Sequence, residues 1–172
     1  MKIITLAIRK LFALRWNLVI YGISFAIPIF ISHPQWITGT IVNCLLYITA
    51  ERLSKKESLP VVVLPSLGAI AYGVLFGPQT VFLYYFLPFI WIGNYLLVFL
   101  STAIKNQNYF IRVVLSASIK YIFLVAFANL YFNFKIVPRL FITSMGIIQL
   151  VTAIAGGILS YFILKLLNKD HE

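Results

Sequence analysis

RVVLSASIKYIFLVAFANLYF, residues 112–132, is an apolar run that contains one internal charge, at Lys120. A transmembrane helix needs about 20 mostly apolar residues, so this run is long enough to cross a bilayer. No acidic residue lies near Lys120 in the sequence. A lone cation at membrane depth is costly and usually faces a protein interior, where it binds something. The run therefore predicts a membrane helix with a functional lysine, although snorkelling or loss of charge through burial are alternatives.

The composition supports the same class of protein. Of the 172 residues, 62% are hydrophobic and 10% are charged, and the mean hydropathy is +0.98. Soluble globular domains have about 25% charged residues. The chain is therefore predicted to be an integral membrane protein with a single transmembrane domain over residues 1–172. Its net charge of +10 is spread between the apolar runs instead of forming one stripe, so we expect no nucleic-acid binding.

Six apolar segments are predicted to span the membrane as one all-α bundle. Their continuous apolar character argues against strands, which would alternate polar and apolar residues. The predicted spans are Trp16–Ser32, Trp36–Ala50, Leu59–Gly77, Val81–Ile104, Ile111–Phe132 and Leu140–Leu167.

The positions of the basic residues predict that both termini are cytoplasmic. Lys135 and Arg139 would face outward and Lys120 would lie in the membrane, while the other eleven of the 14 basic residues would lie on the inner side. Cytoplasmic loops of membrane proteins carry such an excess of Lys and Arg. Residues 1–15 form a segment that is rich in basic side chains. This segment is predicted either to lie on the membrane surface as an amphipathic helix or to extend the first span.

Strongly polar side chains from four predicted spans share the middle of the membrane. At 1.5 Å per residue, they lie about 10 to 15 Å from a span end, in a hydrocarbon layer about 30 Å thick. The sequence therefore predicts a substrate pocket in the bundle interior, in which Lys120 binds an anionic group and the others supply hydrogen bonds. The predicted substrate-binding residues are Lys120, Asn43, Asn94, Gln149 and Thr152. Each of the four uncharged residues could instead simply hydrogen-bond across helices.

Signatures of catalysis are missing from the sequence. It contains no Walker-type phosphate loop, HExxH pair, nucleophile elbow or cluster of metal ligands. The single cysteine, Cys44, is interpreted as a helix-packing residue. We therefore expect no enzyme activity, cofactor or metal. Because no carboxylate lies within a predicted span, a transport role would need an energising partner.

The segments PQWITGTIVN, LPSLGAI, LPFIWIGNYLLV and QLVTAIAGG resemble those of a bacterial group of small six-span membrane proteins. In size and topology the whole chain resembles the S components, the substrate-binding subunits of energy-coupling factor transporters. The resemblance implies capture of a vitamin or similar micronutrient, and partners comprising a membrane scaffold and two ATPases. In that family the first span contacts the scaffold protein through a pattern of two small residues separated by three others. Gly22-xxx-Ala26 matches this pattern loosely.

The leading hypothesis is therefore a substrate-capture subunit in a bacterial cytoplasmic membrane, with a small ligand expected to be anionic. The alternative is a non-transport scaffold or accessory protein whose buried polar residues only hold helices together.

Overall fold

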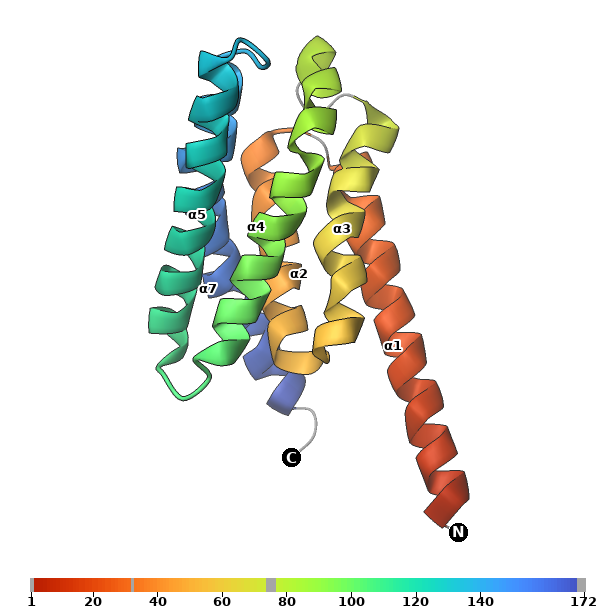
Figure 1. The fold of residues 1–172 in the computed structure, drawn as a ribbon. Coiled ribbons are helices and arrows are strands. Elements are labelled where there is room, and N and C mark those ends of the chain that lie inside the picture. The colour runs from red at the N-terminus through yellow and green to blue at the C-terminus, as the bar shows by residue number, and fades with distance from the viewer. Residues whose placement is uncertain (1, 32, 74–76, 170–172) are drawn as a thin grey trace.

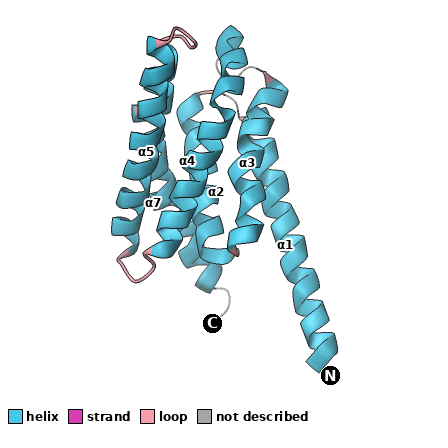
Figure 2. Ribbon diagram, viewed as in Figure 1, coloured by secondary structure: helices cyan, strands magenta, loops and turns pink. Residues whose placement is uncertain are grey.

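The computed structural model describes the backbone of residues 2–31, 33–73 and 77–169, and the side chains of residues 16–31, 33–73 and 79–167. Within these ranges the chain is helical and contains no strand (Figure 2). The elements in chain order are α1 (Lys2–Phe30), α2 (Gln35–Arg52), α3 (Lys55–Tyr72), the 3-10 helix η1 (Gly77–Phe82), α4 (Leu83–Ala103), α5 (Tyr109–Asn133), α6 (Leu140–Met145) and α7 (Ile147–Lys169).

The long helices form one bundle whose ends are easily told apart (Figure 1). The most extensive contacts join α2 to α7, α1 to α3, and α4 to α5. The start of α1 and the end of α7 lie at the same end of the bundle, together with the α2–α3 and α4–α5 turns. This end is named the Glu51 end, and the opposite one, with the α1–α2 connection, is named the His33 end.

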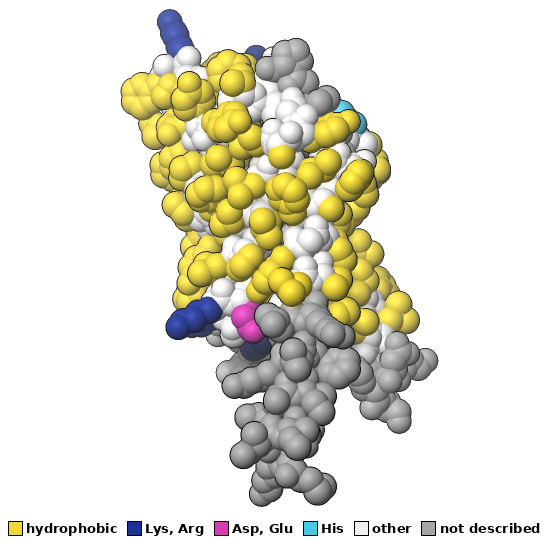
Figure 3. All heavy atoms as spheres, turned by 90° about the vertical axis from the view of Figure 1, so that its right-hand side faces the viewer, with side chains coloured by type: hydrophobic (Ala, Val, Ile, Leu, Met, Phe, Trp, Pro, Cys, Tyr) yellow, Lys and Arg dark blue, Asp and Glu magenta, His cyan; other side chains and the backbone are white. Residues whose placement is uncertain are grey.

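Three helical segments are long and apolar enough to cross a membrane, namely Gln79–Ala103, Tyr109–Asn133 and Leu140–Leu167. The described apolar part of α1, Trp16–Phe30, is shorter. Many large apolar side chains are exposed on the bundle, and on the face in Figure 3 the charged side chains gather at the two ends. An apolar surface of this extent suits a lipid environment. The prediction of an all-helical membrane protein is confirmed to this extent: the described chain is helical, and three of its segments can cross a membrane.

The predicted helix boundaries need two corrections. The last predicted span is not one helix, because Gly146 separates α6 from α7 with non-helical backbone angles (φ −97°, ψ −112°). A Cβ on Gly146 would lie 2.4 Å from the carbonyl oxygen of Ile142, so this close turn requires glycine. The third helix begins before Leu59, because Ser54 and Glu57 form a capping box, and it ends at Tyr72 with Gly73 in the left-handed region (φ 72°).

The N-terminal segment continues directly into the first helix. The backbone of α1 is a single helix from Lys2 to Phe30. Figure 1 shows the first turns of α1 beyond the rest of the bundle at the Glu51 end. The side chains of residues 1–15 lie outside the described part of the chain, so their predicted membrane contact stays a prediction.

Two apolar clusters fill the bundle, one toward each end. The cluster toward the Glu51 end includes Leu46, Tyr47, Leu97, Val113 and Ala153. The cluster toward the His33 end includes Leu83, Phe86, Leu124, Phe141 and Met145. On α4 and α5 the residues between the two clusters include Asn94 and Lys120. The polar side chains thus form a layer between two apolar ones.

A partly buried ion pair ties α2 to α4 and α5 near the Glu51 end. The Arg112 guanidinium is 6% exposed and pairs with Glu51. Its Nε donates to the Ser101 carbonyl oxygen at 3.0 Å. Lys105 Nζ lies 3.9 Å from the other Glu51 oxygen. No sequence pattern marks this contact, because Glu51 and Arg112 come from helices that are far apart in the chain.

We expect Glu51→Gln to destabilise the bundle by about 1–3 kcal/mol, because it leaves the buried Arg112 charge without its partner. The cost stays below that of a fully buried pair, since the Glu51 side chain is 23% exposed. The measurement is denaturant unfolding of the purified chain in detergent. Lys105→Gln is the matched control, with an expected loss within about 1 kcal/mol because Lys105 is largely solvated. Equal losses in the two variants would contradict the prediction.

Candidate functional site

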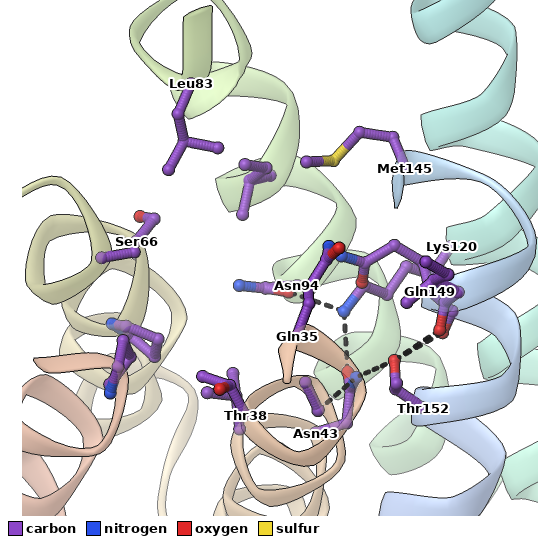
Figure 4. Close-up of a pocket in the computed structure, with 17 residues that line it drawn as sticks. Gln35, Thr38, Asn43, Ser66, Leu83, Asn94, Lys120, Met145, Gln149 and Thr152 are labelled. Atoms are coloured by element: carbon purple, nitrogen blue, oxygen red, sulfur yellow. Dashed lines mark hydrogen bonds between the residues drawn. The ribbon is translucent and has the colours of Figure 1, made fainter. Parts of the chain in front are cut away.

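A cavity of about 80 Å³ lies in the polar layer and extends toward the His33 end (Figure 4). Every long helix contributes to its wall, as does α6. The lining residues are Pro28, Gln35, Thr38, Gly39, Val42, Asn43, Pro65, Ser66, Ala69, Leu83, Ile90, Asn94, Lys120, Met145, Ile148, Gln149 and Thr152.

Lys120 is held at the cavity by two amide side chains. Its side chain is 2% exposed, and Nζ donates to Asn43 Oδ1 at 2.7 Å and to Asn94 Oδ1 at 2.8 Å. Within the described residues, no carboxylate lies within ion-pair distance of Lys120. An ammonium group has three N–H donors, so one donor remains for a further acceptor. Burial without a carboxylate partner makes an anion in the cavity the natural counter-charge.

The two asparagines are oriented by backbone carbonyls. Asn43 Nδ2 donates to the Gly39 carbonyl oxygen at 2.9 Å, and Asn94 Nδ2 donates to the Val62 carbonyl oxygen at 3.0 Å. These bonds fix the orientation of the two amides so that both Oδ1 atoms face Lys120. The site therefore presents two acceptors to the ammonium in a fixed geometry.

Thr152 connects α7 to this network. Its Oγ1 accepts from Asn43 Nδ2 at 3.2 Å and donates to the Ile148 carbonyl oxygen at 2.7 Å. The close approach of α2 and α7 makes the contact possible. Gly156 allows it, because a Cβ there would lie 2.7 Å from both Thr40 O and Cys44 N.

Gln149 and Gln35 also line the cavity, from α7 and from the first turn of α2. In the described part of the chain, no hydrogen bond engages either side-chain amide. Each amide carries two N–H donors and one acceptor oxygen. Both are therefore available to a bound molecule, and Gln35 lies at the His33 end of the cavity.

All five predicted site residues line this one cavity, from α2, α4, α5 and α7. Their role as substrate contacts stays a prediction. The predicted pocket did not include α1 and α3, which contribute Pro28, Pro65 and Ser66 to the wall. Both prolines lie inside continuous helices, where a proline removes a backbone hydrogen bond, and this sequence signal marks their positions.

Trp91, on α4, lies behind the cavity wall. Its Nε1 donates to Ser66 Oγ at 2.7 Å, and its ring packs against the apolar cluster toward the Glu51 end. Trp91 supports the cavity wall through Ser66 without lining the cavity. Ser116 lies one turn before Lys120 on α5 and hydrogen-bonds to Tyr47 Oη at 3.1 Å.

Comparison of the chain with protein-family models, with curated proteins and with solved structures gives no match.

Proposed function

We propose that this chain is a six-span membrane protein that captures a small anionic solute in the cavity at Lys120. Three helices of sufficient length and apolar character support a bilayer location. The distribution of Lys and Arg supports cytoplasmic termini, which would place the His33 end outside. The cavity extends from Gln35 at that end to the polar layer, so a solute would enter from the outer side.

The observation that carries the proposal is the buried Lys120 ammonium, bound by two amide oxygens with a donor to spare at the cavity. If Lys120 had only a structural role, the cavity would not need the side-chain amides of Gln149 and Gln35, which form no hydrogen bond in the described fold. Together these groups offer donors from three helices to a molecule rich in acceptors.

The resemblance to S components extends this proposal. On that basis the chain is a substrate-capture subunit for a micronutrient, located in a bacterial cytoplasmic membrane. It would rely on separate scaffold and ATPase subunits for energy, because the described spans present no buried carboxylate for ion coupling.

A second candidate function is that of an accessory protein with a structural polar layer. It is favoured by the hydrogen bonds of Asn43, Asn94 and Thr152, which join α2, α3, α4, α5 and α7. Under this alternative, the cavity would hold only water.

The two functions predict different results in native mass spectrometry of the tagged chain, purified in mild detergent from its own host. Capture predicts a stoichiometric small-molecule adduct on the wild type, which Lys120→Met loses while remaining folded. Lys165→Met, an exposed lysine on α7, is the matched control and should retain the adduct. A wild-type chain without adduct, or an adduct that survives Lys120→Met, would contradict capture at this site. Co-purification of a scaffold and ATPases would support the transporter extension.

A further inference from the structure

The charge on the cavity wall limits the charge of the ligand. Of the 17 lining residues, Lys120 is the one that carries a charge. Net charge in a water-poor interior is costly unless it is paired. A monoanion would form a neutral pair with Lys120. A dianion would bring a second negative charge for which the described wall has no cation.

The size of the cavity limits the size of the ligand. Its volume is about 80 Å³. An engineered cavity of about 150 Å³ holds benzene, and one water needs about 10–15 Å³ on this measure. The described cavity thus has about half the volume of that benzene-sized one, which suits a molecule of a few heavy atoms better than an aromatic ring.

The two sides of the cavity differ in chemistry. Lys120, Asn43 and Thr152 form a polar side, near which Gln149 lies (Figure 4). Leu83 and Met145 lie on the side away from Asn43 and Thr152 (Figure 4). This division suits a molecule with an anionic group at one end and a short apolar part at the other.

We infer that the cavity selects a compact monoanion with a short alkyl group, the class of the short-chain monocarboxylates. The carboxylate accepts from Lys120 and from the Gln149 amide, and the alkyl group contacts Leu83 and Met145. This inference rests on the proposed capture function and narrows it, because it excludes ring-containing vitamins and multivalent anions from the cavity as described.

The test is isothermal titration calorimetry on the full chain in lipid nanodiscs, in a buffer without carboxylates. The probes are acetate and propionate, with succinate and phosphate as multivalent anions and benzoate as a larger monoanion. We expect acetate and propionate to bind at least tenfold more tightly than the other three.

Three variants connect the binding to the cavity. Lys120→Met should weaken propionate binding at least tenfold. Gln149→Leu removes a donor that has no partner in the fold, so it should weaken propionate binding about tenfold without disturbing the bundle. This variant keeps the test decisive if Lys120→Met does not fold. Met145→Ala enlarges the apolar side and should improve benzoate binding at least tenfold. Lys165→Met should leave binding unchanged.

Two results would overturn the inference in distinguishable ways. Lys120-dependent binding of succinate, phosphate or benzoate that is as tight as that of propionate would overturn the monoanion class and leave the capture function standing. The capture function itself would be overturned if no probe binds and the wild-type chain carries no native adduct. It would also be overturned if the probes bind but Lys120→Met and Gln149→Leu do not weaken that binding.

Discussion

Asn94→Leu is expected to destabilise the bundle by about 2–3 kcal/mol, since it removes a hydrogen bond to a buried charged group. Lys120 Nζ would keep Asn43 Oδ1 as its one remaining acceptor in the described network, and the Val62 carbonyl oxygen would lose the Asn94 donor. A buried charge that loses a partner is the main source of the loss.

Removing the lysine as well should relieve part of this loss. Lys120→Met replaces the ammonium with an apolar group of similar length. The double variant Asn94→Leu/Lys120→Met is therefore expected to be more stable than Asn94→Leu alone, by at least about 1 kcal/mol. The measurement is a double-mutant cycle of denaturant unfolding in detergent.

Asn129→Leu is the matched control for this cycle. Asn129 is an exposed asparagine on α5, and its Nδ2 donates to the Val125 carbonyl oxygen within the same helix. Its replacement should change stability by less than about 0.5 kcal/mol, as is usual for surface substitutions. If the losses from Asn94→Leu and Lys120→Met are simply additive, Asn94 does not hold the Lys120 ammonium in the folded protein.

Gly156→Ala is expected to separate α2 from α7. The added Cβ would lie 2.7 Å from Thr40 O and Cys44 N, and 2.8 Å from Asn43 Cβ. Two of these atoms are backbone atoms, so the helices themselves have to move. Overpacking of this kind typically costs about 1–3 kcal/mol, and it outweighs the gain of about 1 kcal/mol that alanine brings to a helix.

The same displacement should weaken ligand binding. It stretches the 3.2 Å bond from Asn43 Nδ2 to Thr152 Oγ1 and shifts Asn43 Oδ1 away from Lys120. The checks are thermal unfolding and propionate titration on the same preparation.

Gly22→Ala serves as the control for Gly156→Ala. Nothing lies within 4 Å of the position that a Cβ on Gly22 would occupy. This variant should be neutral, or more stable by up to about 1 kcal/mol, through helix propensity alone. A Gly156→Ala variant as stable as Gly22→Ala would show that α2 and α7 are not in backbone contact at Gly156.

The helical class and the polar residues of the site were accessible from the sequence for a common reason. Position along a helix is proportional to residue number, so span ends are enough to estimate depth. Lys120, Asn43, Asn94 and Gln149 were therefore placed at similar depths from the sequence, and the structure brings them to one cavity together with Thr152.

Depth does not specify how each helix is rotated about its axis or which helices are neighbours. These properties depend on packing, for example on the backbone approach at Gly156 and on the turn at Gly146. Only the tertiary structure could therefore show that Asn43 and Asn94 bind Lys120 and that α3 forms part of the wall.

The sequence by itself determined the apolar helices, their approximate ends and the polar layer, because local composition and the rise per residue are enough for these. The tertiary structure decided the partners of Lys120, the ion pair between Arg112 and Glu51, and the small volume of the cavity. These features depend on contacts between residues far apart in the chain, which no local pattern encodes.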